Sequence, residues 1–213
     1  MTCARILATV ASLVLCHPLF AEVVTEELIY RHGDTEMRGM LAYDNASQEA
    51  RPGILVVHEW WGQNDYPRER ARGLAALGYA ALAIDMYGDG RTAAHPDDAG
   101  KFASVVGGNL PLARARFEAA LAALREQPTV ADDKIAAIGY CFGGGVVINM
   151  ARLGTDIDGV VSYHGSLTTS DPAGPGDIKT RELLFNGADD PLVTADQIEA
   201  FCNEMDTAGA DYQ

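Results

Sequence analysis

The stretch Gly139-Tyr140-Cys141-Phe142-Gly143-Gly144 decides the fold of this chain. The run Lys134-Ile-Ala-Ala-Ile138 precedes it and predicts a buried strand of a parallel sheet, and residues 144–151 can continue as a helix. Glycine flanks the cysteine on both sides, as the tight turn of a nucleophile elbow requires, because side chains there would collide with neighbouring elements. The pattern predicts that Cys141 is a nucleophile exposed at the carboxyl end of the sheet. It therefore indicates an enzyme.

The rest of the chain alternates strands with helices, which is typical of an α/β fold. Two strands at 23–30 and 37–43 predict an antiparallel hairpin at the edge of the sheet. Further strands are expected at 54–57, 79–84, 159–162 and 182–185, with helices at 67–77, 112–127 and 194–208. Residues 88–110 predict a loop with one short helix. We expect one doubly wound, mostly parallel sheet.

Composition limits the classes of partner. With 213 residues, 48% of them hydrophobic, the chain can bury one sizeable core but not a second domain. The net charge of −14 and the pI of about 4.6 argue against nucleic acid and against an anionic membrane surface. We expect a monomer that acts on a small molecule.

Residues 1–21 predict a secretory signal. Arg5 supplies a positive start, 6–15 an apolar run, and 18–21 a cleavage region. The apolar run is shorter than the roughly 20 residues that a membrane helix needs. A lipoprotein signal at Cys16 and a buried N-terminal helix are the alternatives. Export to the periplasm is expected, which makes 22–213 the mature domain.

Signal removal leaves two cysteines, Cys141 and Cys202. An oxidising compartment would permit a disulfide between them. However, Cys202 shares one helix face with Ile198, Phe201 and Met205, at i, i+3, i+4 and i+7 spacing. This spacing favours Cys202 as a small core residue.

A cysteine nucleophile must be a thiolate, and a free thiol with a pKa of about 8.5 is only slightly ionised at neutral pH. A helix N-terminus lowers that pKa, and a histidine held by a carboxylate can accept the proton. The order expected along the chain is nucleophile, acid, histidine. Asp189 and Asp190, which directly follow the strand at 182–185, are the candidates for the acid.

Two further stretches accompany the elbow, Val57-His-Glu-Trp-Trp-Gly62 and Gly187-Ala-Asp-Asp-Pro-Leu-Val193. From about residue 25 onward, this chain resembles the dienelactone hydrolase family of α/β-hydrolases. The resemblance implies that Cys141 forms an acyl-enzyme with an ester or lactone, that Asp190 is the triad acid, and that Glu59 contacts the resting thiol. It also implies an oxyanion hole made of the backbone N–H groups of Trp60 and Phe142.

The histidines depart from the family pattern. The resemblance implies a histidine about thirty residues after the acid, whereas none of the histidines follows Asp190: His17, His32, His58, His95 and His164. We expect the α/β-hydrolase domain to be incomplete at its C-terminus, without its last strand and helix, and turnover to be weak. His58 is expected to pack structurally, and His95 to be exposed. His164 lines the pocket or caps a strand end.

The substrate pocket is expected to include Trp60, Trp61 and Tyr87. Family members that hydrolyse dienelactone hold its carboxylate with arginines, and Arg91 is the nearest equivalent here, displaced in sequence. The resemblance therefore implies a small ester or lactone rather than dienelactone in particular.

Three alternatives belong to other classes. A non-catalytic binding protein could keep this fold without the triad histidine. A dinucleotide-binding domain is disfavoured because no G-x-G-x-x-G follows the first strand of a βαβ unit. A metal site is disfavoured because the paired aspartates at 97–98, 132–133 and 189–190 lack the ligand spacing of calcium or zinc sites. No cofactor is expected.

Overall fold

The computed structural model describes residues 22–46 and 49–213. The expected signal at 1–21 lies outside these residues, so export stays a prediction. Within the described part, no helix has the length and apolar content of a membrane span.

One seven-stranded sheet organises the described chain, in the order β1-β2-β4-β3-β5-β6-β7. The strands are β1 (Val23–His32), β2 (Thr35–Asp44), β3 (Arg51–Val57), β4 (Ala80–Ile84), β5 (Val130–Tyr140), β6 (Gly159–Tyr163) and β7 (Arg181–Phe185). β2 pairs antiparallel with β1 and β4, and all other pairs are parallel. The expected edge hairpin and mostly parallel sheet are confirmed.

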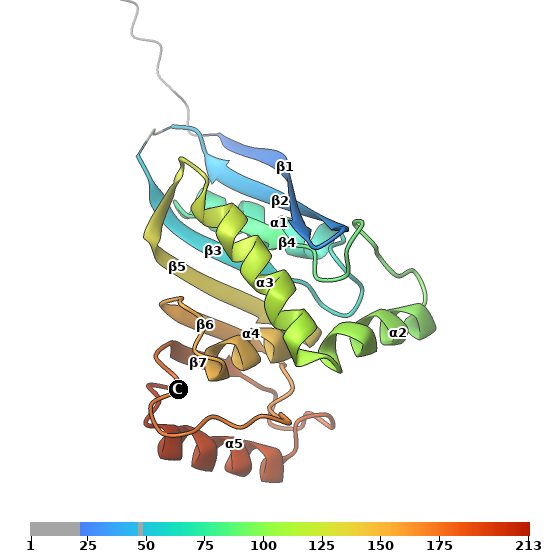
Figure 1. Cartoon of the computed structure of the whole chain (residues 1–213), viewed down its shortest axis with the longest axis vertical. Coiled ribbons are helices and arrows are strands. Elements are labelled where there is room, and N and C mark those ends of the chain that lie inside the picture. The colour runs from blue at the N-terminus through green and yellow to red at the C-terminus, as the bar shows by residue number, and fades with distance from the viewer. Residues whose placement is uncertain (1–21, 47–48) are drawn as a thin grey trace, which may run out of the picture.

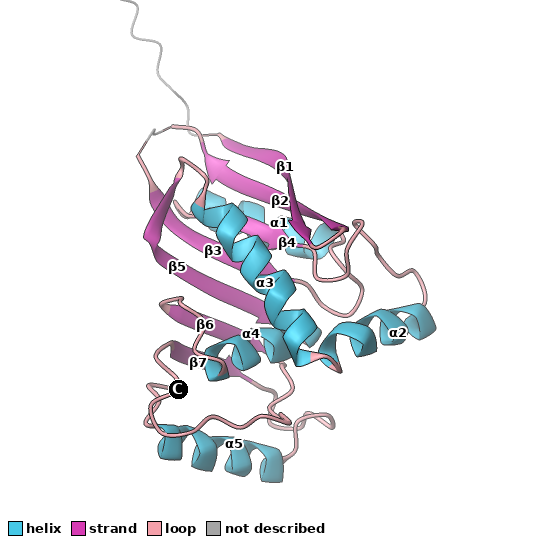
Figure 2. Ribbon diagram, viewed as in Figure 1, coloured by secondary structure: helices cyan, strands magenta, loops and turns pink. Residues whose placement is uncertain are grey.

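Helices cover both faces of this sheet (Figures 1 and 2). They are α1 (Asp65–Ala76), α2 (Pro96–Gly107), α3 (Leu110–Arg125), α4 (Phe142–Arg152) and α5 (Ala195–Ala208). α1 packs alone against one face through Ala71 and Ala75, while α3 and α4 bury Phe117 and Val147 against the other. α5 packs beside α4 through Phe201 and Met205. This is the two-sided layering that the alternating pattern predicts.

The region 88–110 is more ordered than the sequence indicates, because α2 is a full helix of 12 residues. It begins with His95 as N-cap, whose exposed side chain accepts from the Asp97 N–H at 3.3 Å. Pro96 and two acidic residues occupy the first turn, as the helix dipole favours. Histidine is not a favoured N-cap residue, so the start of this helix is hard to recognise from sequence. The expected exposure of His95 is confirmed.

Residues 211–213 lie parallel along the outer edge of β7. The Gln213 N–H donates to the Glu182 carbonyl and the Leu184 N–H to the Gln213 carbonyl, both at 2.9 Å. Residues 211–213 therefore extend the pairing of the sheet by one isolated parallel bridge.

Asp85, at the end of β4, organises the loop that follows. Its Oδ1 accepts from the N–H groups of Tyr87 and Gly88, both at 2.8 Å. Its Oδ2 accepts from those of Gly90 at 2.9 Å and Arg38 at 3.2 Å. Asp85 is fully buried, so these amides have no access to water in its place. One carboxylate therefore fixes the 85–90 loop against β2.

His58, directly after β3, links the ends of β3 and β4. Its ring is fully buried, with Nδ1–H donating to the Glu59 carbonyl at 2.5 Å and Nε2 accepting from the Met86 N–H at 3.2 Å. Burial lowers the pKa of His58 to about 4, so the ring is neutral at neutral pH. The packing role expected for His58 is confirmed.

Asp85→Asn should destabilise the fold by about 3 kcal/mol, because an amide can accept at only one of its two terminal atoms and leaves buried N–H groups unpaired. Urea unfolding at pH 7 measures this loss. Asp89→Asn is the matched control, since Asp89 is exposed and its side chain pairs only with Arg91. A shift below about 0.5 kcal/mol is expected for the control. Equal effects of the two substitutions would contradict the role of Asp85.

His58 should make unfolding pH-dependent. Its folded pKa lies below the unfolded value of 6.5, so the unfolded chain binds the proton more readily. Stability from this residue is complete above pH 6.5 and falls as the pH approaches 4, by up to roughly 3 kcal/mol. Urea unfolding of wild type and His58→Asn across this range should show a shallower slope for the variant. His95→Asn should keep the wild-type slope, and a His58→Asn slope equal to wild type would refute the assignment.

Candidate active site

Cys141 occupies the turn between β5 and α4 with φ 53° and ψ −111°, a strained conformation for a residue with a side chain. Two glycines make this turn possible. A Cβ on Gly139 would lie 2.1 Å from the Gly143 carbonyl oxygen, and one on Gly143 would lie 2.4 Å from the Val57 carbonyl oxygen. The Cys141 N–H donates to the Tyr163 carbonyl at 2.8 Å, which ties the turn to β6. The elbow predicted from the glycine spacing is present.

His164 follows β6 and pairs with the loop after β7. Its Nδ1 is hydrogen-bonded to Oδ2 of Asp190, and its backbone N–H donates to the Phe185 carbonyl at 2.8 Å. His164 has φ 57° and a half-exposed side chain. The next residue, Gly165, packs so closely on Gly144 that a Cβ on Gly165 would lie 2.5 Å from the Gly144 carbonyl carbon. This contact brings the His164 loop against the start of α4.

Asp190 is held from two sides. Besides His164, the Leu192 N–H donates to its Oδ1 at 2.9 Å. Its side chain is only 6% exposed. The Leu192 N–H and then the His164 ring lower the pKa of this carboxyl, which is ionised at neutral pH. Asp189, by contrast, is exposed.

A cavity of about 410 Å³ opens beside the elbow. Its lining comes from α2, α3, α4 and the loops after β3, β6 and β7. The lining residues are Trp60, Ala103, Gly107, Leu110, Ala113, Cys141, Phe142, Gly145, Val146, Asn149, Met150, His164, Ser166, Thr168, Leu192 and Val193. The cavity thus contains the thiol, a histidine bound to a carboxylate, and a largely apolar wall.

Burial raises the pKa of the Cys141 thiol, and the negative charges of Glu59 and Asp190 raise it further. The Phe142 N–H donates to the sulfur and acts in the opposite direction. The resting sulfur is therefore mostly a thiol at neutral pH. Glu59 is half-buried and lies near enough for its charge to act on Cys141. The direct contact with the thiol that the resemblance implies stays a prediction.

The backbone before the cavity is held by Tyr87, whose hydroxyl donates to the Trp60 carbonyl at 2.9 Å. Tyr87 is 3% exposed, and burial raises the pKa of its hydroxyl. In the described chain, neither the Trp60 nor the Phe142 N–H donates to a backbone carbonyl. The Trp60 amide is therefore available to another acceptor, while the Phe142 amide donates to the resting sulfur.

Three residues expected in the pocket do not line this cavity: Trp61, Tyr87 and Arg91. Tyr87 packs against the rings of His58 and Phe142, which also stack on each other. Trp61 packs edge-on against Trp60, with ring centroids 5.0 Å apart. Arg91 is exposed and pairs with Asp89 at 2.6 Å. Their positions in the sequence do not reveal that these three side chains lie outside the cavity.

The helical part of the cavity wall, which comes from α2, α3 and α4, is not marked in the sequence. Ala103, Leu110 and Met150 follow helical periodicity like any core residue, so nothing in their local sequence marks them as lining a cavity. Cys141 and Cys202 are both free thiols, and Cys202 is half-buried on α5. No group of three metal-ligating side chains occurs in the part of the chain that the structure describes.

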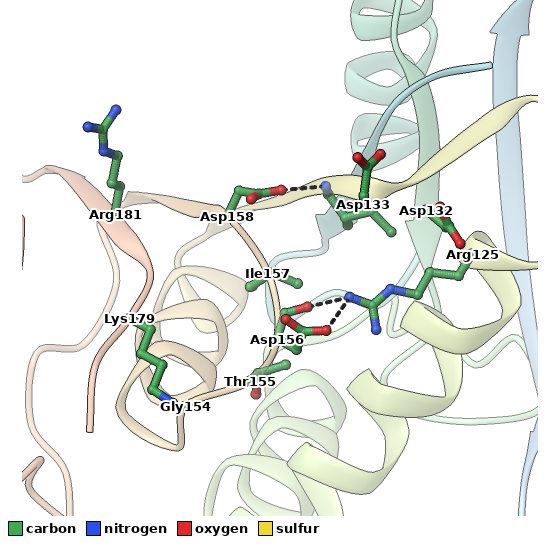
Figure 3. Close-up of a pocket in the computed structure, with 11 residues that line it drawn as sticks. Arg125, Asp132, Asp133, Gly154, Thr155, Asp156, Ile157, Asp158, Lys179 and Arg181 are labelled. Atoms are coloured by element: carbon green, nitrogen blue, oxygen red, sulfur yellow. Dashed lines mark hydrogen bonds and ion pairs between the residues drawn. The ribbon is translucent and has the colours of Figure 1, made fainter. Parts of the chain in front are cut away.

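A second hollow of about 950 Å³ lies at the opposite end of the sheet, where β6 and β7 begin (Figure 3). Some of its charged groups bond within the protein. Arg125 donates to the Asp156 carboxylate at 2.9 Å, and the Asp158 carboxylate accepts from the Ile135 N–H at 2.8 Å. Ligands of open α/β sheets bind at the carboxyl ends of the strands, where Cys141 lies. The elbow cavity is therefore the candidate active site.

Comparison with known proteins shows which family and which relatives this chain resembles. The Usf protein of Aquifex pyrophilus is 34% identical over 119 residues, which cover 54% of this chain and 51% of Usf. This chain thus spans about half the length of that relative. Carboxymethylenebutenolidase of Pseudomonas putida is 27% identical over 179 residues, covering 81% of this chain and 75% of the enzyme.

Two solved structures superpose closely on this chain. The structure m3DLH superposes with a TM-score of 0.84 and 39% identity, covering 90% of this chain and 80% of that chain. The dienelactone hydrolase-like promiscuous phosphotriesterase P91 from metagenomic libraries gives a TM-score of 0.84 and 36% identity, with the same coverage. These relatives support a hydrolase function. Since the family's sequence model matches residues 37–213, and so includes both the elbow and the Asp190 loop, this chain belongs to the dienelactone hydrolase family of α/β-hydrolases.

Proposed function

We propose that this protein hydrolyses small carboxylic esters or lactones through an acyl-enzyme on Cys141. One observation carries the proposal: the strained elbow cysteine shares a cavity with a histidine that is bound to a buried aspartate. A nucleophile, a base and a group that orients the base are the three parts that acyl transfer by a thiol requires.

The proposed reaction uses these groups in turn. Nδ1 of His164 is bound to Asp190, which leaves Nε2 to take the thiol proton from Cys141. The sulfur attacks the carbonyl carbon, and the resulting oxyanion accepts from the Trp60 and Phe142 N–H groups. The ester C–O bond breaks, and His164 returns its proton to the leaving alkoxide. Water, deprotonated by His164, then attacks the thioester, which releases the acid and restores the thiol.

His164 precedes the acid in the chain, whereas the family resemblance implies a histidine after it. The hydrogen bond to Asp190 supports His164 as the base among the described residues. If His164 performs this role, turnover exceeds the weak activity expected when no histidine follows Asp190.

Variants of the three groups test the proposal with p-nitrophenyl acetate. Cys141→Ala should abolish both the burst of p-nitrophenolate and the acetyl adduct in the intact mass, whereas Cys202→Ala should retain them. His164→Gln should lower turnover by about 100-fold or more, in line with the loss of a general base. Unchanged turnover in His164→Gln would show that another group removes the proton. Binding of the ester without acylation would instead support a non-catalytic binding protein.

Glu59 should restrain the resting thiol, because its negative charge raises the pKa of Cys141. Glu59→Gln removes that charge, so the pH midpoint of Cys141 alkylation by iodoacetamide should move to lower pH. Alkylation at pH 7 should become several-fold faster. The control is Glu69→Gln. Glu69 is exposed on α1, and this substitution removes its ion pair with Arg72. An unchanged or higher midpoint in Glu59→Gln would contradict this role.

A further inference from the structure

We propose that the cavity beside Cys141 selects acyl groups that are uncharged and apolar, and excludes acyl groups that end in a carboxylate. This inference rests on the proposed function and names the substrate class of the same site. It starts from the composition of the cavity wall and from the charges around the sulfur.

Much of the cavity wall is hydrocarbon. Its apolar lining includes Leu110 and Ala113 of α3, Val146 and Met150 of α4, and Phe142, which follows Cys141 in the chain. Met150 is fully buried, and Val146 and Ala113 are 5% and 3% exposed. An apolar acyl chain would bury its own surface against these side chains without leaving a polar group unpaired.

The polar side chains of the wall already bond within the protein. Asn149 Nδ2 donates to the Gly145 carbonyl at 2.9 Å, and its Oδ1 accepts from Arg152 at 3.3 Å. The hydroxyls of Ser166 and Thr168 lie 3.0 Å apart and bond to each other. A ligand carboxylate could accept from the one hydroxyl and the one amide hydrogen that these bonds leave over, but neither of these donors carries a positive charge.

No lysine or arginine is among the residues that line the cavity in the described chain. The arginines of nearby elements are engaged elsewhere. Arg91 pairs with Asp89, Arg116 donates to the Met86 carbonyl at 2.7 Å, and Arg152 pairs with Glu204 at 2.8 Å. The one cationic candidate in the wall, His164, is bound to Asp190.

The charges that do act on the site are negative. Both Glu59 and Asp190 raise the pKa of the Cys141 thiol, so both carboxylates project their field onto the reacting sulfur. A carboxylate at the end of the substrate's acyl chain would be repelled by these two negative charges. It would also lose its hydration without forming an ion pair with a lysine or arginine. Burying an unpaired charge is strongly unfavourable. The cavity therefore discriminates by charge as well as by polarity.

Small residues create the room for an acyl chain. Ala103 and Gly107 of α2 and Ala113 of α3 are among the lining residues. The cavity volume of about 410 Å³ lies within the range of small-molecule sites. A six-carbon acyl chain is thus a suitable probe.

The experiment compares p-nitrophenyl hexanoate with the p-nitrophenyl monoester of adipic acid, in which a carboxylate replaces the terminal methyl group. Acylation rate constants of Cys141 are taken from the p-nitrophenolate burst and divided by the rate of each ester with a free thiol in solution. At pH 7, the hexanoate ester should acylate Cys141 about tenfold faster than the adipate monoester, or more. This ratio should be larger at low salt.

Leu110→Arg supplies the missing cation and should reduce this preference by about tenfold. Leu110→Gln, which adds polarity without charge, should change it much less. Leu77→Arg places the same charge at an exposed position at the end of α1, on the other face of the sheet, and should leave the preference unchanged.

Equal acylation by the two esters in wild type would overturn the inference while leaving the thiol hydrolase intact. A preference for hexanoate that Leu110→Arg does not reduce would overturn the charge argument. Failure of both esters to acylate Cys141 would overturn the proposed function itself, and this inference with it.

Discussion

The backbone contact between the elbow and β3 is the constraint on which the site depends. Gly143 lies against the Val57 carbonyl so closely that no side chain fits, and Gly139 meets the Gly143 carbonyl in the same way. These contacts pull the first turn of α4 down onto the carboxyl ends of the strands. Cys141 then has only the strained conformation available, and its side chain opens into the cavity rather than into the core. Packing of the whole sheet holds this strain in place.

The groups around Cys141 act in opposite directions on the ionisation of its thiol. The Phe142 N–H donates to the sulfur and favours its thiolate, while burial and two carboxylates favour the neutral thiol. The balance keeps the resting sulfur protonated and limits unwanted oxidation or alkylation. A base bound to Asp190 is then needed at the moment of reaction, which gives His164 its importance in the proposed mechanism.

Two buried polar groups keep the loops around the cavity in position. His58 joins the ends of β3 and β4 through its two ring nitrogens, and Asp85 holds the loop after β4 through four N–H groups. Tyr87, which lies on that loop, in turn fixes the Trp60 carbonyl. Ordered hydrogen bonds therefore hold in place the backbone N–H groups that could donate to an oxyanion, as preorganised sites require.

Local sequence determined the sheet class, the edge hairpin, the elbow at Cys141 and the candidate acids at 189–190, because each depends on periodicity or on glycine at fixed spacing. It did not determine that His164 reaches Asp190, that Tyr87 and Arg91 lie outside the cavity, or that α2 and α3 form part of its wall. These facts depend on how β6, β7 and three helices meet at one end of the sheet, and residues far apart in the chain become neighbours only there. Side-chain direction at loop ends follows from such packing, which no local pattern of residues encodes.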